Sequence, residues 1–170
     1  MEEYIEECRE LSLTARAAVG LLVFERFCLL NELGSKDISD FLNYMWQWPL
    51  IDGADEFEPW EQSRPKLVDY GLGDDADTEI EEMLVSSDIP EEKFRNLVCG
   101  IVDTLWGSFW GAAENESSLK CLQGAIRAAN LKVLPPLTPF RFSKFSEGSG
   151  WGNKIRPQDC EFWRGCIQNT

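Results

Sequence analysis

Apolar residues recur at helical spacing along residues 11–33, and they cover more than one side of the expected helix. The stripe consists of Leu11, Ala15, Ala18, Leu22, Leu29 and Leu33, and it is widened by Val19, Val23, Phe24 and Phe27. A helix that is apolar on several sides is buried at the centre of a protein rather than on its surface. We therefore predict a central helix over residues 11–33, with other helices packed around it.

A second strong helical pattern covers residues 90–113 and supplies the other half of the expected core. One face is formed by Phe94, Leu97, Val98, Ile101, Leu105 and Phe109, and Trp106 and Trp110 widen it. Gly100, Gly107 and Gly111 lie near one side of this helix. Because glycine weakens a helix, three of them indicate close packing against another backbone. The alternative is a groove for a ligand.

Shorter helices are expected between and after these two. Gly34 should end the first helix, and Ser35 should cap a helix that runs antiparallel to it until Pro49. Pro59 fits the first turn of a short helix that Pro65 ends, and a further helix should start near Thr78, which has capping-box spacing to Glu81. The last predicted helix covers residues 117–130, after which Phe140 to Phe145 could form an edge strand or an ordered arm.

These patterns predict an all-α, or nearly all-α, single-domain bundle of five to six helices. Residues 1–134 would form the helical core, and residues 135–170 would be an irregular, extended aromatic arm packed on it. Six cysteines are present without a Cys-x-x-Cys pair, so reduced core thiols are expected. Cys160 and Cys166 are the one pair close enough in sequence to bond.

The negative charge of the chain is concentrated in one block. Of the thirty acidic residues, fifteen lie between Asp52 and Glu92, where Arg64 and Lys66 are the only basic residues. Such a block repels nucleic acid and anionic lipid and attracts basic protein surfaces. We therefore expect a basic protein partner, and neither nucleic acid nor a membrane as a binding target.

Aromatic residues within this block suggest where a partner would bind. Phe57 and Trp60 lie three residues apart among Glu56, Glu58 and Glu61, which is the composition of an interface hot spot for a basic protein. The alternative is that both rings anchor the segment to the core while the acids face water. The predicted partner-binding residues are Asp55, Glu56, Phe57, Glu58, Trp60, Glu61, Asp74, Asp75 and Asp77.

Motifs that would indicate an enzyme are missing from the sequence. The chain has no histidine, which excludes His-dependent catalysis and His-ligated zinc. Residues 71–76 match the letters of a dinucleotide-binding turn, but Asp74 and Asp75 would stand where a pyrophosphate binds. The calcium-loop spacing of residues 75–79 fails at Ile80 and Ser86. We expect no catalytic residue, metal ligand or cofactor, although a magnesium site formed by two carboxylates stays open.

The likeness to known proteins rests on residues 15–48. Glu25-Arg26 late in an apolar helix, followed by a helix that ends in Met45-Trp46-Gln47-Trp48, resembles the first helical pair of a family of small bacterial helical proteins. Some immunity proteins of bacterial toxin systems are similar in size, acidity and helical content. This resemblance implies a bacterial binding protein and transfers no functional residue.

The function we expect combines these observations. The longest apolar run, Ala17 to Phe24, is too short to span a membrane, and the acidic N-terminus is unlike a signal peptide, so we predict a cytoplasmic protein. We expect a non-catalytic immunity or inhibitor protein that neutralises a basic toxin such as a nuclease. The alternatives are a carboxylate- or metal-dependent enzyme, and a structural or adaptor subunit joined through the aromatic arm.

Overall fold

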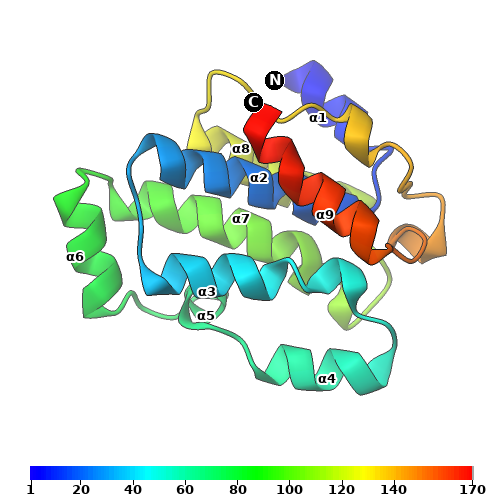
Figure 1. Cartoon of the computed structure of the whole chain (residues 1–170), viewed down its shortest axis with the longest axis horizontal. Helices are drawn as coiled ribbons and strands as arrows, with labels where there is room; N and C mark the ends of the chain where they lie inside the picture. The colour runs from blue at the N-terminus through cyan, green and yellow to red at the C-terminus, as the bar shows by residue number, and fades with distance from the viewer. Residues whose placement is uncertain (170) are drawn as a thin grey trace.

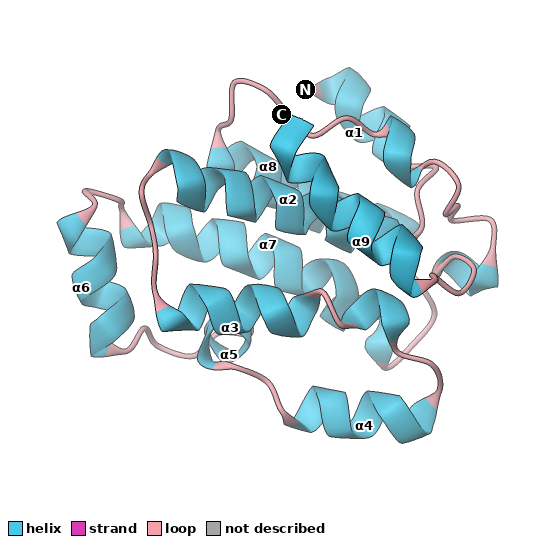
Figure 2. Cartoon of the chain, in the orientation of Figure 1, coloured by secondary structure: helices cyan, strands magenta, loops and turns pink. Residues whose placement is uncertain are grey.

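The structure of the chain is a computed structural model that describes residues 1–169, and the side chains of residues 1–167. Its described part consists of helices and loops without a strand (Figures 1 and 2). The helices are α1 (Glu2–Cys8), α2 (Leu13–Leu30), α3 (Lys36–Met45), α4 (Ala54–Gln62), α5 (Lys66–Gly71), α6 (Thr78–Ser86), α7 (Glu91–Phe109), α8 (Asn115–Ala129) and α9 (Pro157–Gly165). Short 3₁₀ helices are η1 (Trp48–Leu50), η2 (Thr138–Phe140), η3 (Gly148–Gly150) and η4 (Cys166–Asn169). The predicted all-α class is confirmed, with more helices than the five to six expected.

Helices α2 and α7 form the centre of the molecule, as predicted (Figure 1). Phe24 of α2 and Phe94 of α7 are fully buried, and their ring centroids lie 6.0 Å apart. Every residue from Leu13 to Phe24 is buried, which explains why the apolar pattern of this segment has no polar side. Helix α8 packs against both central helices. No helix of the described part has the length and apolar content needed to cross a membrane.

Of the three glycines expected to allow close packing, Gly100 alone does so. A Cβ atom added at Gly100 would lie 2.6 Å from the carbonyl oxygen of Cys121 and 2.8 Å from the amide nitrogen of Ala125, both in α8. Gly107 and Gly111 have no atom within 4 Å of an added Cβ. The prediction is therefore wrong for these two, and Gly111 instead lines a groove that is described below.

This difference predicts opposite effects for two similar substitutions in α7. Gly100→Ala should lower the free energy of unfolding by about 2 kcal/mol, because α8 must move away from the added methyl group. Gly107→Ala should raise it by about 0.5 kcal/mol, because alanine favours the helix and meets open space. Urea unfolding of both variants checks this, and a destabilised Gly107→Ala or an unaffected Gly100→Ala would contradict it.

The predicted helix boundaries are partly right. Ser35 caps α3 as expected, with its Oγ accepting a hydrogen bond from the amide of Ile38 at 3.2 Å. The cap of α6 is Asp77 instead of Thr78, because the Asp77 carboxylate accepts from the amide of Ile80 at 3.0 Å. Pro59 lies inside α4 and not in its first turn, since this helix already begins after Gly53. The segments α2 and α3 run antiparallel, as predicted (Figure 1).

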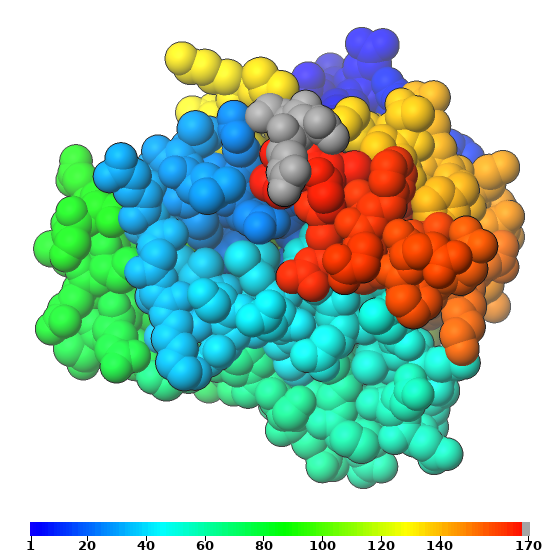
Figure 3. Space-filling model, viewed as in Figure 1, coloured from blue at the N-terminus to red at the C-terminus, as the bar shows by residue number. Residues whose placement is uncertain are grey.

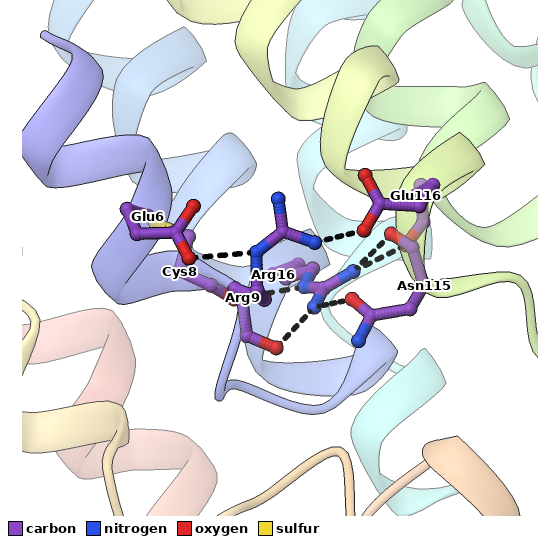
Figure 4. Close-up of polar contacts among 7 residues, drawn as sticks. Glu6, Cys8, Arg9, Arg16, Asn115 and Glu116 are labelled. Atoms are coloured by element: carbon purple, nitrogen blue, oxygen red, sulfur yellow. Dashed lines mark hydrogen bonds and ion pairs between the residues drawn. The ribbon is translucent and has the colours of Figure 1, made fainter.

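A buried arginine joins three helices at one end of the core. Arg16 of α2 is 0% exposed and donates five hydrogen bonds. Three go to the backbone carbonyls of Cys8, Arg9 and Asn115, and a fourth goes to Asn115 Oδ1 (Figure 4). The fifth goes to Ser118 Oγ at 2.6 Å. Burial lowers the pKa of the Arg16 guanidinium to about 10. Arg16 therefore fixes the end of α1 and the start of α8 against α2.

The C-terminal segment packs against the helices, but it is not the extended arm that the sequence suggests. It contains α9, whose Cys160 and Trp163 are buried. Figure 3 shows residues of this segment, in orange and red, covering part of the visible face. The expected edge strand is reduced to a single antiparallel bridge between Leu11 and Lys144. Beside this bridge, the hydroxyl groups of Ser143 and Ser12 form a hydrogen bond of 2.8 Å between their oxygen atoms.

The cysteines are consistent with the expected structural thiols. Cys8, Cys28, Cys99, Cys121 and Cys160 form no disulfide. The Cys160 thiol donates to the carbonyl of Trp46 at 3.6 Å, whereas that of Cys166 donates to the carbonyl of Phe162 at 3.3 Å. Burial raises the pKa of Cys8 and of Cys28 to about 12. These two thiols are therefore protonated at neutral pH and poor nucleophiles.

Candidate binding site

The acidic residues of α4 are placed by the way this helix begins. Gly53 precedes it with a φ of +83°, a conformation that favours glycine. Asp55 and Glu56 occupy the first turn, where negative charge is favourable to the helix dipole. The Glu56 carboxylate also accepts a hydrogen bond from the backbone amide of Asp52 at 2.8 Å. The acids at this end thus stabilise the helix and still face solvent.

Exposure divides the predicted residues of α4 into two groups. Asp55, Glu56 and Glu58 are exposed, Phe57 is half-buried, and Trp60 is 4% exposed. Glu61 forms an ion pair with Arg64. The position of Trp60 supports the alternative interpretation of the sequence, in which the aromatic residues anchor the segment to the core. Three carboxylates of this helix are available to a partner, whereas the Trp60 ring is not.

Trp60 belongs to a large aromatic cluster between α4 and the end of α7. Its ring stacks on Tyr44 with centroids 4.6 Å apart, and its Nε1 donates to the Tyr44 carbonyl at 3.2 Å. Trp48 and Trp106 each lie 5.4 Å from Trp60 between ring centroids. This cluster holds α4 against the bundle although the outward side of the helix is acidic.

The second part of the predicted set lies in the loop before α6. Asp74 and Asp75 are exposed, and Asp77 is half-buried as the cap of α6. Figure 1 shows α4 at the lower edge of the molecule and α6 at its left edge, with α3 and α5 between them. The structure therefore does not bring the two parts of the predicted site together.

Asp77 belongs to a small cluster of carboxylates that the sequence does not reveal. Oxygen atoms of Asp37, Asp77 and Glu79 lie within 4.8 Å of one another, and Asp37 comes from α3. The Lys66 ammonium lies 2.6 Å from Asp77 and 3.5 Å from Glu79. Its hydrogen bond to Asp77 lowers the pKa of that carboxyl. Lys66 thus supplies the positive charge that a metal ion would otherwise bring.

Most of the acidic block carries no counter-charge from the described side chains. Six of its fifteen acids form ion pairs, namely Asp52, Glu61, Asp69, Asp77, Glu79 and Glu91. The other nine form none within the described residues, and all of them are exposed: Asp55, Glu56, Glu58, Asp74, Asp75, Glu81, Glu82, Asp88 and Glu92. This surface has a negative charge that is available to a partner.

A groove of about 450 Å³ opens beside the N-terminal end of α4. Its aromatic walls are Trp48, Phe57, Phe109 and Trp151. Phe109 is central, with ring centroids 4.9 Å from Trp48, 5.1 Å from Phe57 and 5.6 Å from Trp151. Asp52 and Lys154 form an ion pair at this groove. The volume is in the range of small-molecule sites, which are also mostly apolar.

Two buried hydroxyl groups also line the groove. Thr14 of α2 is 6% exposed. The groove-lining polar atom that is buried without a hydrogen-bond partner in the described residues is the indole Nε1 of Trp48. Ser108 is 2% exposed, and its Oγ accepts from the backbone amide of Glu114 at 3.1 Å. Of Gly100, Gly107 and Gly111, only Gly111 points to this groove. Trp151 and Lys154 give no such signal, because they approach the groove from far along the chain.

Comparison with known proteins gives no relative from which a function could be transferred. No protein-family model, curated protein or solved structure matches the chain.

Proposed function

We propose that this protein is a non-catalytic binding protein that presents the exposed carboxylates of α4 and the α6 region to a basic protein partner. An immunity protein that neutralises a basic toxin, for example a nuclease, is the case that this surface fits best. The single observation that carries the proposal is the set of nine exposed acids without an ion pair to a described side chain. A surface of this kind accelerates encounter with a positively charged protein.

Two further features favour binding over catalysis. The chain has no histidine to act as a general base near neutral pH. The thiols of Cys8 and Cys28 are buried with raised pKa values, which removes these cysteines as nucleophiles. The acids of α4 belong to a short helix held by aromatic contacts, so they would meet a partner on a preformed surface.

The test is a comparison of two variants that change the charge equally in different places. The first replaces Asp55, Glu56 and Glu58 on α4 by Asn, Gln and Gln. The control replaces Glu2, Glu3 and Glu10 by Gln, since these are also exposed and form no ion pair within the described residues. Proteins that co-purify with the unmodified chain would be identified, and their association rates measured over a range of salt concentrations.

We expect a basic partner whose association rate falls steeply with salt and drops about tenfold in the α4 variant at low salt. The association rate of the control variant should fall much less, because its substituted charges lie near α1, on the opposite edge of the molecule from α4 (Figure 1). An equal fall of the association rate in both variants would show that only the net charge matters, and not the position of the carboxylates on α4. Association that does not depend on salt would overturn the proposal.

A further inference from the structure

The groove beside α4 combines several features that are typical of a ligand-binding site. It has four aromatic walls, a carboxylate at its edge and the hydroxyl of Thr14, a residue that is 94% buried. It is also lined by Trp48, whose indole Nε1 is buried and has no hydrogen-bond partner in the described residues. A buried polar group without a hydrogen bond costs free energy, and a bound polar atom would remove that cost. This property does not depend on the protein partner proposed above.

The edge of the groove already holds one ammonium group. Lys154 Nζ contacts the Asp52 carboxylate, although the lysine is 68% exposed and reaches it across 102 residues of sequence. The hydrogen bond to Asp52 and the nearby Glu56 raise the pKa of Lys154. Asp55, Glu56 and Glu58 add negative charge on the adjoining helix. The surroundings of the groove therefore favour a cation and oppose an anion.

The aromatic walls provide the second element of cation recognition. Trp48, Phe57 and Trp151 are half-buried, so part of each ring remains accessible. Faces of aromatic rings attract ammonium groups, and they also accept an aromatic ring by stacking. A ligand that carries both a ring and an ammonium group would use the walls and the carboxylate together.

We propose that this groove binds a small aromatic primary amine, with its ring packed against the accessible faces of Trp48, Phe57 and Trp151, its ammonium group at Asp52 and a ring hydroxyl at Thr14. Lys154 competes with the ligand for Asp52. The site is thus a receptor for a hydroxyaryl alkylamine and is distinct from the surface carboxylates proposed to contact a protein.

Three probes separate the parts of this proposal. Tyramine carries the ring, the hydroxyl and the amine. Phenethylamine lacks the hydroxyl, and 3-(4-hydroxyphenyl)propionate replaces the amine by a carboxylate. Binding to the full chain would be followed by tryptophan fluorescence and by NMR of the indole N–H signals of Trp48 and Trp151. Tyramine should bind at least about tenfold tighter than the propionate, because the acidic surroundings oppose the anion.

Two variants at the edge of the groove should change the affinity for tyramine in opposite directions. Asp52→Asn should weaken tyramine binding about fivefold, because the ammonium group loses its carboxylate. Lys154→Met should strengthen it about threefold, because the competing ammonium group is removed while the apolar stem stays. A gain in affinity cannot result from misfolding, so the second variant keeps the test decisive if the first is unstable.

Thr14→Val tests the buried hydroxyl. It should abolish the preference for tyramine over phenethylamine while phenethylamine binding persists, since the change removes one hydrogen-bonding group. Equal binding of the propionate and tyramine, an unchanged affinity in both edge variants, or indole signals of Trp48 and Trp151 that do not move would each overturn the proposal. None of these outcomes bears on association with a basic protein.

Discussion

Replacing Arg16 by alanine should lower the free energy of unfolding by about 4 kcal/mol or more. The substitution removes five hydrogen bonds at a residue that is 0% exposed, and it leaves the carbonyl groups of Cys8, Arg9 and Asn115 without this donor. It also opens a cavity between α1, α2 and α8. Each buried acceptor that loses its partner costs about 1–3 kcal/mol, and the cavity adds to this loss.

Chemical denaturation of Arg16→Ala and Arg16→Lys would measure the loss. The lysine variant should fall between the wild type and the alanine variant, because it keeps the charge but has fewer donors and no planar fork. Arg127→Ala is the matched control on α8, since Arg127 is exposed and has no ion pair within the described part of the chain. A loss below about 1 kcal/mol for Arg16→Ala would show that this network is not an anchor.

The network of Arg16 also marks a limit of sequence analysis. The segment around it is apolar at helical spacing, so the central position of α2 could be predicted from periodicity alone. The same pattern gives no indication that an arginine in this stripe is buried. Its acceptors are backbone oxygens at the end of α1 and backbone and side-chain oxygens at the start of α8, where Asn115 lies 99 residues away. Contacts of this kind depend on the tertiary arrangement.

Helix α9 and the residues that build the groove from distant parts of the chain could not be predicted, for a similar reason. Helix α9 has nine residues, which is too short for a convincing apolar period, and glycines surround the preceding turn. The groove depends on Trp151 meeting Phe109 and on Lys154 meeting Asp52. Neither contact has a local signature, whereas the strong patterns of α2 and α7 arise within a few turns of one helix.

The charge of the acidic block could be predicted, but the state of its individual carboxylates could not. A count gives fifteen acids between Asp52 and Glu92. The structure separates those that cap a helix or bind a basic side chain, such as Asp77, from those that are exposed without an ion pair to a described residue, such as Asp55 and Glu58. Only the second group is free to act on a partner, and it is spread over two edges of the molecule (Figure 1).

Replacing Trp60 by alanine should lower the free energy of unfolding by about 4 kcal/mol, because the residue is 4% exposed and its removal leaves a large cavity. The change also removes the stacking on Tyr44 and the hydrogen bond to the Tyr44 carbonyl. Trp110→Ala is the matched control, since Trp110 is 77% exposed and, among the described residues, its one ring contact with this cluster is with Phe57. Trp110→Ala should change the free energy of unfolding by no more than about 0.5 kcal/mol.

The stabilities of the Trp60 and Trp110 variants show whether the aromatic residues of the acidic block anchor α4 or contact a partner. If Trp60 anchors α4 to the core, urea unfolding will show the full loss for Trp60→Ala, and Trp60→Phe will keep both the fold and any association with a basic partner. The exposed carboxylates would then account for binding, with the aromatic cluster holding their helix in place. An unchanged stability together with loss of partner association would instead place the Trp60 ring at the interface, and it would require α4 to leave its position against Tyr44.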